Sequence, residues 1–311
     1  MEHYAAFLGG LIGLVFFADQ FVKGSSIIAK VYRIPPVIIG VVLLGFGTSL
    51  PESLVSIAAA QAGDLDIGAG NILGSNVANL TLVMAAAAMF TQISIPPKIL
   101  RKEGLLTLVA SVALTIVLVN EFISRLEGLL LLGGGILTLL YIVRDKSEEV
   151  PIEVEQDQSK APVEFIRIGL GLLGTVVGAY FTVKGADGLA KSWGITGGFV
   201  GFLLIAIGTS LPELVTTASC AKRGETEMII GNLFGSNIFN SLLVGGLMGV
   251  VGPGSIDDSN LSGRGVGFML LVTFLLLGIA FFRKKLHKSE GIILIVLYVV
   301  AVAFLGMNSA T

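Results

Sequence analysis

The sequence has few charged residues and almost no cysteine. Only 14% of its 311 residues are Asp, Glu, Lys or Arg, whereas 54% are hydrophobic. The single Cys220 excludes an internal disulfide framework, and a formal net charge of -2 is too small to indicate a nucleic-acid partner. Apolar stretches of roughly 17 to 25 residues are abundant, and this is the length that crosses a bilayer as a helix. The sequence therefore predicts an all-α polytopic membrane protein.

The apolar stretches divide into ten candidate spans, five on each side of one charged segment. We expect them at about 4 to 22, 35 to 60, 67 to 91, 103 to 120, 127 to 143, 164 to 184, 195 to 219, 227 to 251, 266 to 282 and 289 to 306. No basic region precedes the first stretch, which indicates a retained helix rather than a signal peptide. The charged segment is poor in aromatic residues, as in a solvated linker. We therefore expect five-helix repeats over 1–143 and 164–311, joined by an acidic linker over 144–163.

Lysine and arginine are distributed unequally between the two sides of this predicted bundle. One side carries little beyond Arg125, Lys191 and Arg264. The other side carries Lys30, Arg33, Lys98, Arg101, Lys102, Arg144, Lys146, Lys160, Lys222, Arg223, Arg283, Lys284, Lys285 and Lys288. Under the positive-inside rule the richer side is cytoplasmic. We therefore expect a multi-pass cell-membrane protein with both termini extracytoplasmic and the acidic linker cytoplasmic.

The two halves of the chain repeat each other at a constant offset. The letters GTSLPE occur at Gly47–Glu52 and again at Gly208–Glu213, so that adding 161 to a residue number gives its counterpart. At this repeat offset, GNILGSNVAN at Gly70–Asn79 becomes GNLFGSNIFN at Gly231–Asn240. A match of this extent without an insertion argues against chance. Because each half has five spans, an odd number, the second half must be inverted in the membrane, an arrangement typical of transporters that work by alternating access.

Each GTSLPE motif places a glutamate, Glu52 or Glu213, near the middle of an apolar span. A carboxylate at this depth costs about 2.5 kcal/mol or more, so something must compensate both. The motif prolines remove backbone donors, which predicts carbonyl oxygens without helical partners near Gly47 and Gly208. Hydroxyl oxygens lie beside them, at Thr48, Ser49, Thr209 and Ser210. Oxygen ligands without nitrogen or sulfur suit hard cations such as Ca²⁺ and Na⁺.

The second motif supplies further oxygens on a neighbouring span. Ser75 and Asn79 are four residues apart and share a helical face, and the same holds for Ser236 and Asn240. We expect these faces to point at the glutamates, and we expect the helices to break near Pro51, Gly74, Pro212 and Gly235. A serine in a membrane helix most often bonds back to its own helix, and an isolated asparagine often only links helices. Neither alternative accounts for a buried glutamate at the same register in both halves.

GTSLPE paired with GN..GSN in two inverted five-helix halves resembles the alpha-repeats of the calcium/cation antiporter superfamily, most closely the prokaryotic sodium/calcium exchangers. The resemblance covers nearly the whole chain. It implies that Glu52 and Glu213 are shared by a calcium site and flanking sodium sites, and that the first and sixth spans slide against the core. The further site residues that it implies are Thr48, Thr209, Ser49, Ser210, Ser75, Ser236, Asn79, Asn240 and the carbonyls near Gly45 and Ala206.

The resemblance also implies a function. It predicts a secondary active antiporter, not an enzyme, with Ca²⁺ and Na⁺ as transported substrates and no organic cofactor. We expect it to work as a monomer in the lipid bilayer. No histidine lies within a span to activate Ser49 or Ser210 as a nucleophile, which argues against an intramembrane hydrolase. A channel is disfavoured because an inverted repeat fits alternating access better than a continuous pore.

The number of exchanged ions stays open at this stage. Close members of the family often carry Asp where this sequence has Asn240, so only two carboxylates remain and the site is nominally 2-. Ca²⁺ or two Na⁺ would neutralise it, whereas three Na⁺ would leave one positive charge. A two-to-one exchange and a three-to-one exchange are therefore both considered. A proton/calcium or potassium-dependent exchanger is the alternative function, since a buried glutamate readily takes up a proton when its cation leaves.

Overall fold

The structure is a computed structural model that describes residues 2–144, 161–192 and 208–306, and almost all of these residues are helical. Elements written η are π-helical turns. The first half contains α1 (Glu2–Val31), α2 (Pro36–Ile39), η1 (Gly40–Gly45), α3 (Phe46–Thr48), α4 (Leu50–Ala62), α5 (Leu65–Ala78), η2 (Asn79–Val83), α6 (Met84–Phe90), β1 (Ile93–Ser94), α7 (Pro97–Ile99), η3 (Leu100–Gly104), α8 (Leu105–Leu118), β2 (Phe122–Ile123) and α9 (Arg125–Arg144).

The second half contains α10 (Ala161–Ser192), α12 (Leu211–Arg223), α13 (Thr226–Ile238), η5 (Phe239–Val244), α14 (Gly245–Val251), β3 (Gly254–Ser255), η6 (Leu261–Gly265), α15 (Val266–Arg283), β4 (Lys285–Leu286) and α16 (Lys288–Gly306). Most of the predicted linker, 144–163, and the first part of the predicted seventh span, 195–219, lie outside the described residues.

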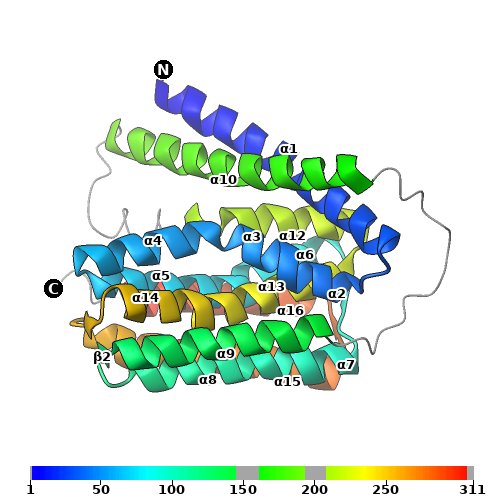
Figure 1. Cartoon of the computed structure of the whole chain (residues 1–311). Helices are drawn as coiled ribbons and strands as arrows, with labels where there is room; N and C mark the ends of the chain where they lie inside the picture. The colour runs from blue at the N-terminus through cyan, green and yellow to red at the C-terminus, as the bar shows by residue number, and fades with distance from the viewer. Residues whose placement is uncertain (1, 145–160, 193–207, 307–311) are drawn as a thin grey trace.

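Helices α1 and α10 lie side by side and form a layer of their own across the other helices (Figure 1). Glycines permit the close contact: a Cβ atom added at Gly178 would lie 2.6 Å from the backbone nitrogen of Leu14. The hydroxyls of Thr175 and Thr182 donate to carbonyls four residues earlier in α10. These two threonines therefore take the local role that is usual in membrane helices.

The centre of the remaining bundle is formed by the continuous segments Leu65–Phe90 and Thr226–Val251. In the most apolar window of each segment 78% of the residues are buried, compared with 22% in Arg125–Arg144. The helices α8, α9 and α15 lie on the far side of this centre from the α1–α10 layer (Figure 1). The two GSN segments therefore lie at the core of the protein.

Six helices in the described part of the chain are long and apolar enough to cross a membrane. The number rises to seven if Pro36–Thr48 and Leu50–Ala62, which meet at an angle of 44°, form one broken span. The structure therefore has the apolar helices of a multi-pass membrane protein. The count of ten spans stays a prediction.

Element boundaries repeat at the offset found in the sequence. Adding 161 to the bounds of α4 gives those of α12, and adding 161 to the bounds of α6 gives those of α14. Gly63 and Gly224, which end α4 and α12, have positive φ angles of 78° and 74°. Because both positions adopt the left-handed conformation that glycine tolerates, the two helices end in the same way.

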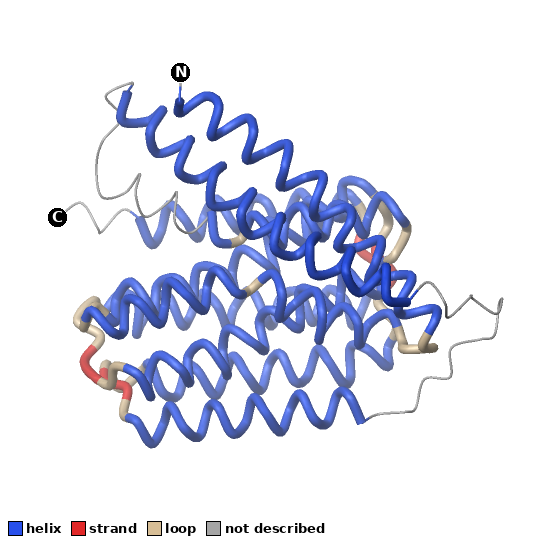
Figure 2. The backbone as a smooth tube through the Cα atoms, turned by 45° about the horizontal axis from the view of Figure 1, so that its top comes forward, coloured by secondary structure: helices blue, strands red, loops and turns tan. Residues whose placement is uncertain are grey.

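Two short antiparallel sheets lie at opposite ends of the bundle (Figure 2). Strand β1 pairs with β4, so that Ser94 lies opposite Lys285, and β2 pairs with β3. The first sheet brings the basic segments 98–102 and 283–285 to the same end of the molecule. This is the grouping that the distribution of lysine and arginine predicts.

Helix α1 also contacts α12 through a polar cluster. Asp19 accepts hydrogen bonds of 2.8 Å from the guanidinium of Arg223 and 2.9 Å from the hydroxyl of Ser219. Near the end of α1, Ser26 donates to the carboxylate of Glu225. These contacts fix one end of the α1–α10 layer to the core.

Candidate cation site

The GTSLPE segment forms a helix break with a regular restart. Ser49 adopts φ -85° and ψ 12°, and α4 begins at Leu50 with Pro51 in its first turn. Proline fits there because the first N–H groups of a helix have no intrahelical acceptor. Ser210 adopts φ -86° and ψ 2° before α12, so the second half restarts in the same way. Each glutamate therefore lies in the first turn of a helix, where the helix dipole favours a negative charge.

The carbonyl of Gly47 has no helical partner four residues later, because Pro51 has no N–H, although it accepts a backbone N–H at the end of α3. One detail of the predicted backbone is wrong. The helices do not break near Gly74 or Gly235, since α5 and α13 run through these positions without interruption. They widen instead into the π-helical turns η2 and η5, which begin at Asn79 and Phe239. A π-helical turn accommodates an extra residue without ending the helix and is frequent at functional sites.

Glu52 and Glu213 are both fully buried, and serine hydroxyls donate to them. Ser75 donates to Oε1 of Glu52 over 3.3 Å, from the neighbouring helix of the same half. Ser49 donates to Oε1 of Glu213 over 2.9 Å, from the opposite half. In each carboxylate the second oxygen, Oε2, has no hydrogen-bond partner among the described residues. The two carboxylates therefore each keep one coordination position open.

Ser49 makes a hydrogen bond to Glu213 of the opposite half and no capping bond within its own helix. Ser49 and Glu52 have the Ser-x-x-Glu spacing of a capping box, in which the serine would accept the N–H of the glutamate. No side-chain capping bond forms at Ser49. The same spacing at Ser210 and Glu213 also lacks a capping bond, and the hydroxyl of Ser210 has no partner among the described residues. The motif serines therefore do not cap their own helices, and Ser49 bonds to the glutamate of the opposite half instead.

Two asparagines that the sequence reasoning missed link the halves around the carboxylates. Asn71 donates to the backbone carbonyl of Glu52 over 3.0 Å and accepts the hydroxyl of Thr209 over 3.3 Å. Its counterpart at the repeat offset, Asn232, has its Oδ1 3.4 Å from the hydroxyl of Thr48, which donates over 2.9 Å to the carbonyl of Leu44 four residues earlier. The signal was available in the sequence, because both asparagines are the second residue of the repeated GN..GSN motif.

The asparagines at the π-helical turns differ between the halves. Asn79 donates to Oδ1 of Asn237 over 3.1 Å, while its own Oδ1 has no partner among the described residues. Asn240 is fully buried, and neither its oxygen nor its nitrogen has a partner in the described chain. The hydroxyl of Ser236 donates to the carbonyl of Gly45 over 3.2 Å rather than to Glu213. The remaining predicted position, Ala206, lies outside the described residues.

Close packing of α13 against α2 and η1 positions this side of the site. A Cβ atom added at Gly231 would lie 2.3 Å from the carbonyl oxygen of Val37, so no larger residue fits without moving the backbone. Farther along the same segments, Phe46 and Phe239 pack with their ring centroids 4.3 Å apart. The glycines of the second motif therefore have a packing role that complements its polar residues.

The arrangement is suited to a hard cation. Buried polar atoms are normally hydrogen-bonded, and here several oxygens of the two repeated motifs have no partner in the described chain. These are Oε2 of Glu52, Oε2 of Glu213, Oδ1 of Asn79, Oδ1 of Asn240 and Oγ of Ser210. Among the described residues no group of three or more His, Cys, Asp and Glu side chains could hold a metal ion. The formal charge available in the described site is therefore that of two carboxylates, and the other ligands are neutral oxygens.

The family model described as sodium/calcium exchanger protein matches residues 2–144 and 163–307. The chain belongs to this family. Sodium/calcium exchanger proteins are transporters, not enzymes, and membership agrees with the apolar helices of a multi-pass membrane protein. The resemblance seen in the sequence motifs is thereby confirmed.

Similar proteins match over almost their whole length. The inner membrane protein YrbG of Escherichia coli is 35% identical over 93% of this chain and 91% of its own. The sodium/calcium exchanger MaX1 of Methanosarcina acetivorans is 28% identical over 94% of this chain and 96% of its own. A solved structure of the sodium-calcium exchanger NCX_Mj is 29% identical and superposes with a TM-score of 0.87 over 97% of this chain and 99% of that chain.

Proposed function

We propose that the protein is a secondary active antiporter that exchanges Ca²⁺ for Na⁺ by alternating access. The observation that carries the proposal is the pair of fully buried carboxylates, Glu52 and Glu213, each with one oxygen that has no partner among the described residues. An unpaired buried anion is strongly unfavourable, so the site needs a positive charge to complete it. Membership of the sodium/calcium exchanger family and similarity to MaX1 and NCX_Mj support these two ions as substrates.

The ligands in this proposal have distinct roles. Glu52 and Glu213 bind Ca²⁺ between them and are shared with the Na⁺ sites on either side. Ca²⁺ in proteins is bound by about six to eight oxygen atoms. Oxygen atoms of neutral residues therefore complete the coordination. The proposed neutral ligands and lining residues are Thr48, Thr209, Ser49, Ser210, Ser75, Ser236, Asn79, Asn240 and the carbonyls of Gly45 and Ala206.

The proposed architecture consists of two inverted five-helix repeats, 1–143 and 164–311, joined by a cytoplasmic linker over 144–163. The element bounds support the repeat: adding 161 to the bounds of α4 and α6 gives the bounds of α12 and α14. The N- and C-termini are extracytoplasmic in this arrangement. One copy of the chain contains both glutamates, and the transporter works as a monomer.

Helices α1 and α10 are the moving elements in this proposal. They form a separate layer, and α1 contacts α12 through the pair Asp19–Arg223 and the loop after α12 through the pair Ser26–Glu225. These contacts close one side of the site. Sliding of the α1–α10 layer along the core would break these contacts and close the other side of the site. The site of an inverted-repeat transporter is exposed alternately to the two sides of the membrane in this way.

The charge of the site favours two Na⁺ for each Ca²⁺. Two carboxylates balance either one Ca²⁺ or two Na⁺, and Asn240 supplies no third negative charge. A third Na⁺ would carry an extra charge through the membrane, worth about 2.3 kcal/mol per 100 mV. An exchange of two for one would therefore be independent of the membrane potential.

Proton/calcium exchange is the second candidate, because the two carboxylates that bind the cation are also groups that accept protons. Potassium-dependent exchange is a further variant of the same antiport. Both candidates use the same site and differ only in the driving ion.

Calcium uptake into proteoliposomes tests these proposals together. The purified protein is reconstituted, and radioactive Ca²⁺ uptake is measured with an outward Na⁺, H⁺ or K⁺ gradient imposed one at a time. The proposal expects saturable uptake driven by the Na⁺ gradient and not by the others. Uptake driven only by the H⁺ gradient would replace it with the second candidate, and uptake without any counter-ion would exclude antiport.

A further inference from the structure

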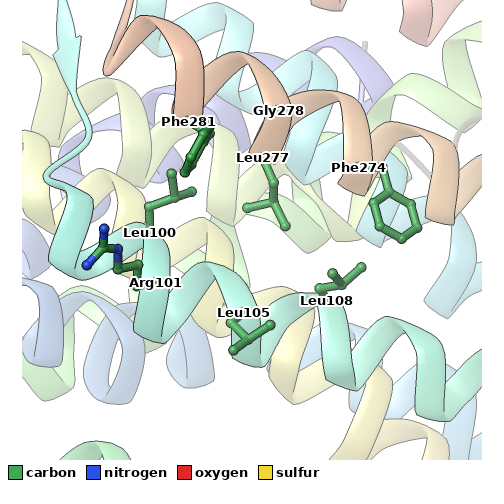
Figure 3. A pocket seen from close by; sticks show the side chains of 8 residues that line it. All are labelled: Leu100, Arg101, Leu105, Leu108, Phe274, Leu277, Gly278 and Phe281. Atoms are coloured by element: carbon green, nitrogen blue, oxygen red, sulfur yellow. The ribbon is translucent and has the colours of Figure 1, made fainter.

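An apolar groove lies on the outer surface between the segment η3–α8 and helix α15. It has a volume of about 420 Å³, and Leu105 and Leu108 line one wall while Phe274, Leu277 and Phe281 line the other (Figure 3). Leu105, Phe274 and Phe281 are each more than half exposed, at 54%, 56% and 60%. In a membrane protein such a surface faces the acyl chains of the bilayer.

One end of this groove is cationic. Figure 3 shows Arg101 beside Leu100 at one end of the groove, with Phe274 toward the other end. Arg101 is exposed and forms no hydrogen bond or ion pair among the described residues. Arg283 and Lys284 follow Phe281 closely at the end of α15, and both are exposed. The groove therefore combines an apolar channel with positive charge at one end.

Two positions of this groove end differ from their counterparts in the other half of the repeat. At the repeat offset, Arg101 corresponds to Ser262, whose hydroxyl donates to a carboxylate oxygen of Glu121 over 3.1 Å. Leu105 corresponds to Val266, which is only 3% exposed. The exposed side chains of Arg101 and Leu105 are therefore not reproduced at the corresponding positions of the other half.

We propose that this groove binds an anionic phospholipid, with an acyl chain along the apolar walls and the headgroup phosphate paired with Arg101. The planar guanidinium suits a phosphate because it donates two hydrogen bonds at once. The basic end is the one predicted to be cytoplasmic, and the cytoplasmic leaflet is the one rich in anionic lipids. The site is separate from Glu52 and Glu213, and its occupancy does not depend on which ions are exchanged.

Lipid retention by the full-length protein tests this proposal. The protein is reconstituted in vesicles of phosphatidylcholine and phosphatidylglycerol in equal amounts and extracted with mild detergent. The lipids that remain bound are then identified by native mass spectrometry. The wild type is expected to retain phosphatidylglycerol in preference to phosphatidylcholine. Arg101→Gln should lower that preference about fivefold, the factor that corresponds to about 1 kcal/mol for one basic residue near an anionic surface.

A second variant tests the groove without changing its charge. A side chain at Gly278, which lines the groove, meets nothing within 4 Å at its Cβ position, so Gly278→Leu should fold and fill the groove. It is expected to reduce retention of both lipids. Gly267→Leu is the matched control, because Gly267 lies about three turns away on the same face of α15 and also has open space at its Cβ position.

Lys222→Gln is the control for charge, since Lys222 is exposed and lies outside the groove. Both controls should retain lipid like the wild type. Three results would each overturn the proposal: no preference for phosphatidylglycerol in the wild type, an unchanged preference in Arg101→Gln, or an equal loss in Lys222→Gln. The last result would assign the preference to general surface charge.

Discussion

Replacing Glu213 by Gln removes one of the two carboxylates proposed to bind calcium while keeping the shape of the side chain. Ser49 still has an oxygen to donate to, so the contact between the halves is retained. The divalent ion then faces a single negative charge in a fully buried site. Removing one partner of a buried charge pair costs about 3–5 kcal/mol, which corresponds to a weakening of calcium binding by about 100- to 4,000-fold. The same argument applies to Glu52→Gln.

Isothermal titration of the purified protein with Ca²⁺, in detergent and without Na⁺, measures this change directly. Glu164→Gln is a suitable control because Glu164 is also buried but lies in α10, where it pairs with Arg167 over 3.1 Å. The control should bind Ca²⁺ like the wild type. If folded Glu213→Gln binds within about threefold of the wild type, a change below about 1 kcal/mol, the carboxylate does not bind the ion and the proposed site is wrong.

The charge of the site, the proposed sliding of the α1–α10 layer and the packing of α13 lead to three further predictions. Wild-type calcium uptake should not respond to a potassium–valinomycin potential, whereas Asn240→Asp should make it voltage-sensitive; strong voltage dependence of the wild type would exclude the two-to-one exchange. A disulfide between Asp19→Cys and Ser219→Cys in a cysteine-free background should abolish exchange but leave Ca²⁺ binding by titration intact, and exchange that survives efficient cross-linking would refute the sliding of α1. Gly231→Ala should destabilise the protein by about 1–3 kcal/mol through overpacking, seen as a lower melting temperature, whereas Gly267→Ala should not.

The sequence was sufficient to predict that Glu52 and Glu213 are buried, because the repeat offset and the apolar spans point to the same two residues. The free-energy cost of a carboxylate in an apolar span must be offset by bound groups or ions. A second carboxylate at the same position of the other repeat is not explained by contacts within a single helix. The structure places both glutamates and most of the predicted hydroxyls and amides around a common buried region. Whether these groups bind the transported ions stays a prediction.

The local backbone was harder to predict. The sequence pattern suggested breaks at Gly74 and Gly235, yet both helices continue and then widen into π-helical turns. Glycine permits a break without requiring one, and at Gly235 its small size permits close contact with the backbone of Val41. At Gly231 this contact is with Val37 and Gly40, far earlier in the chain, and no local pattern reports such a contact.

The partners of the motif serines show a more general limit of the sequence repeat. A constant offset predicts equal pairing in both halves, but Ser49 donates to Glu213 while the hydroxyl of Ser210 has no partner in the described chain. The polar contact of α1 with α12 at Asp19 and Arg223 likewise involves positions whose counterparts are Tyr180 and Ala62. In the proposed mechanism the site lies between two inverted halves and opens to one side at a time, so the two halves must differ in any single conformation. Under this proposal the repeated sequence specifies which residues meet at the site, whereas the pairs formed in one conformation depend on which side is closed.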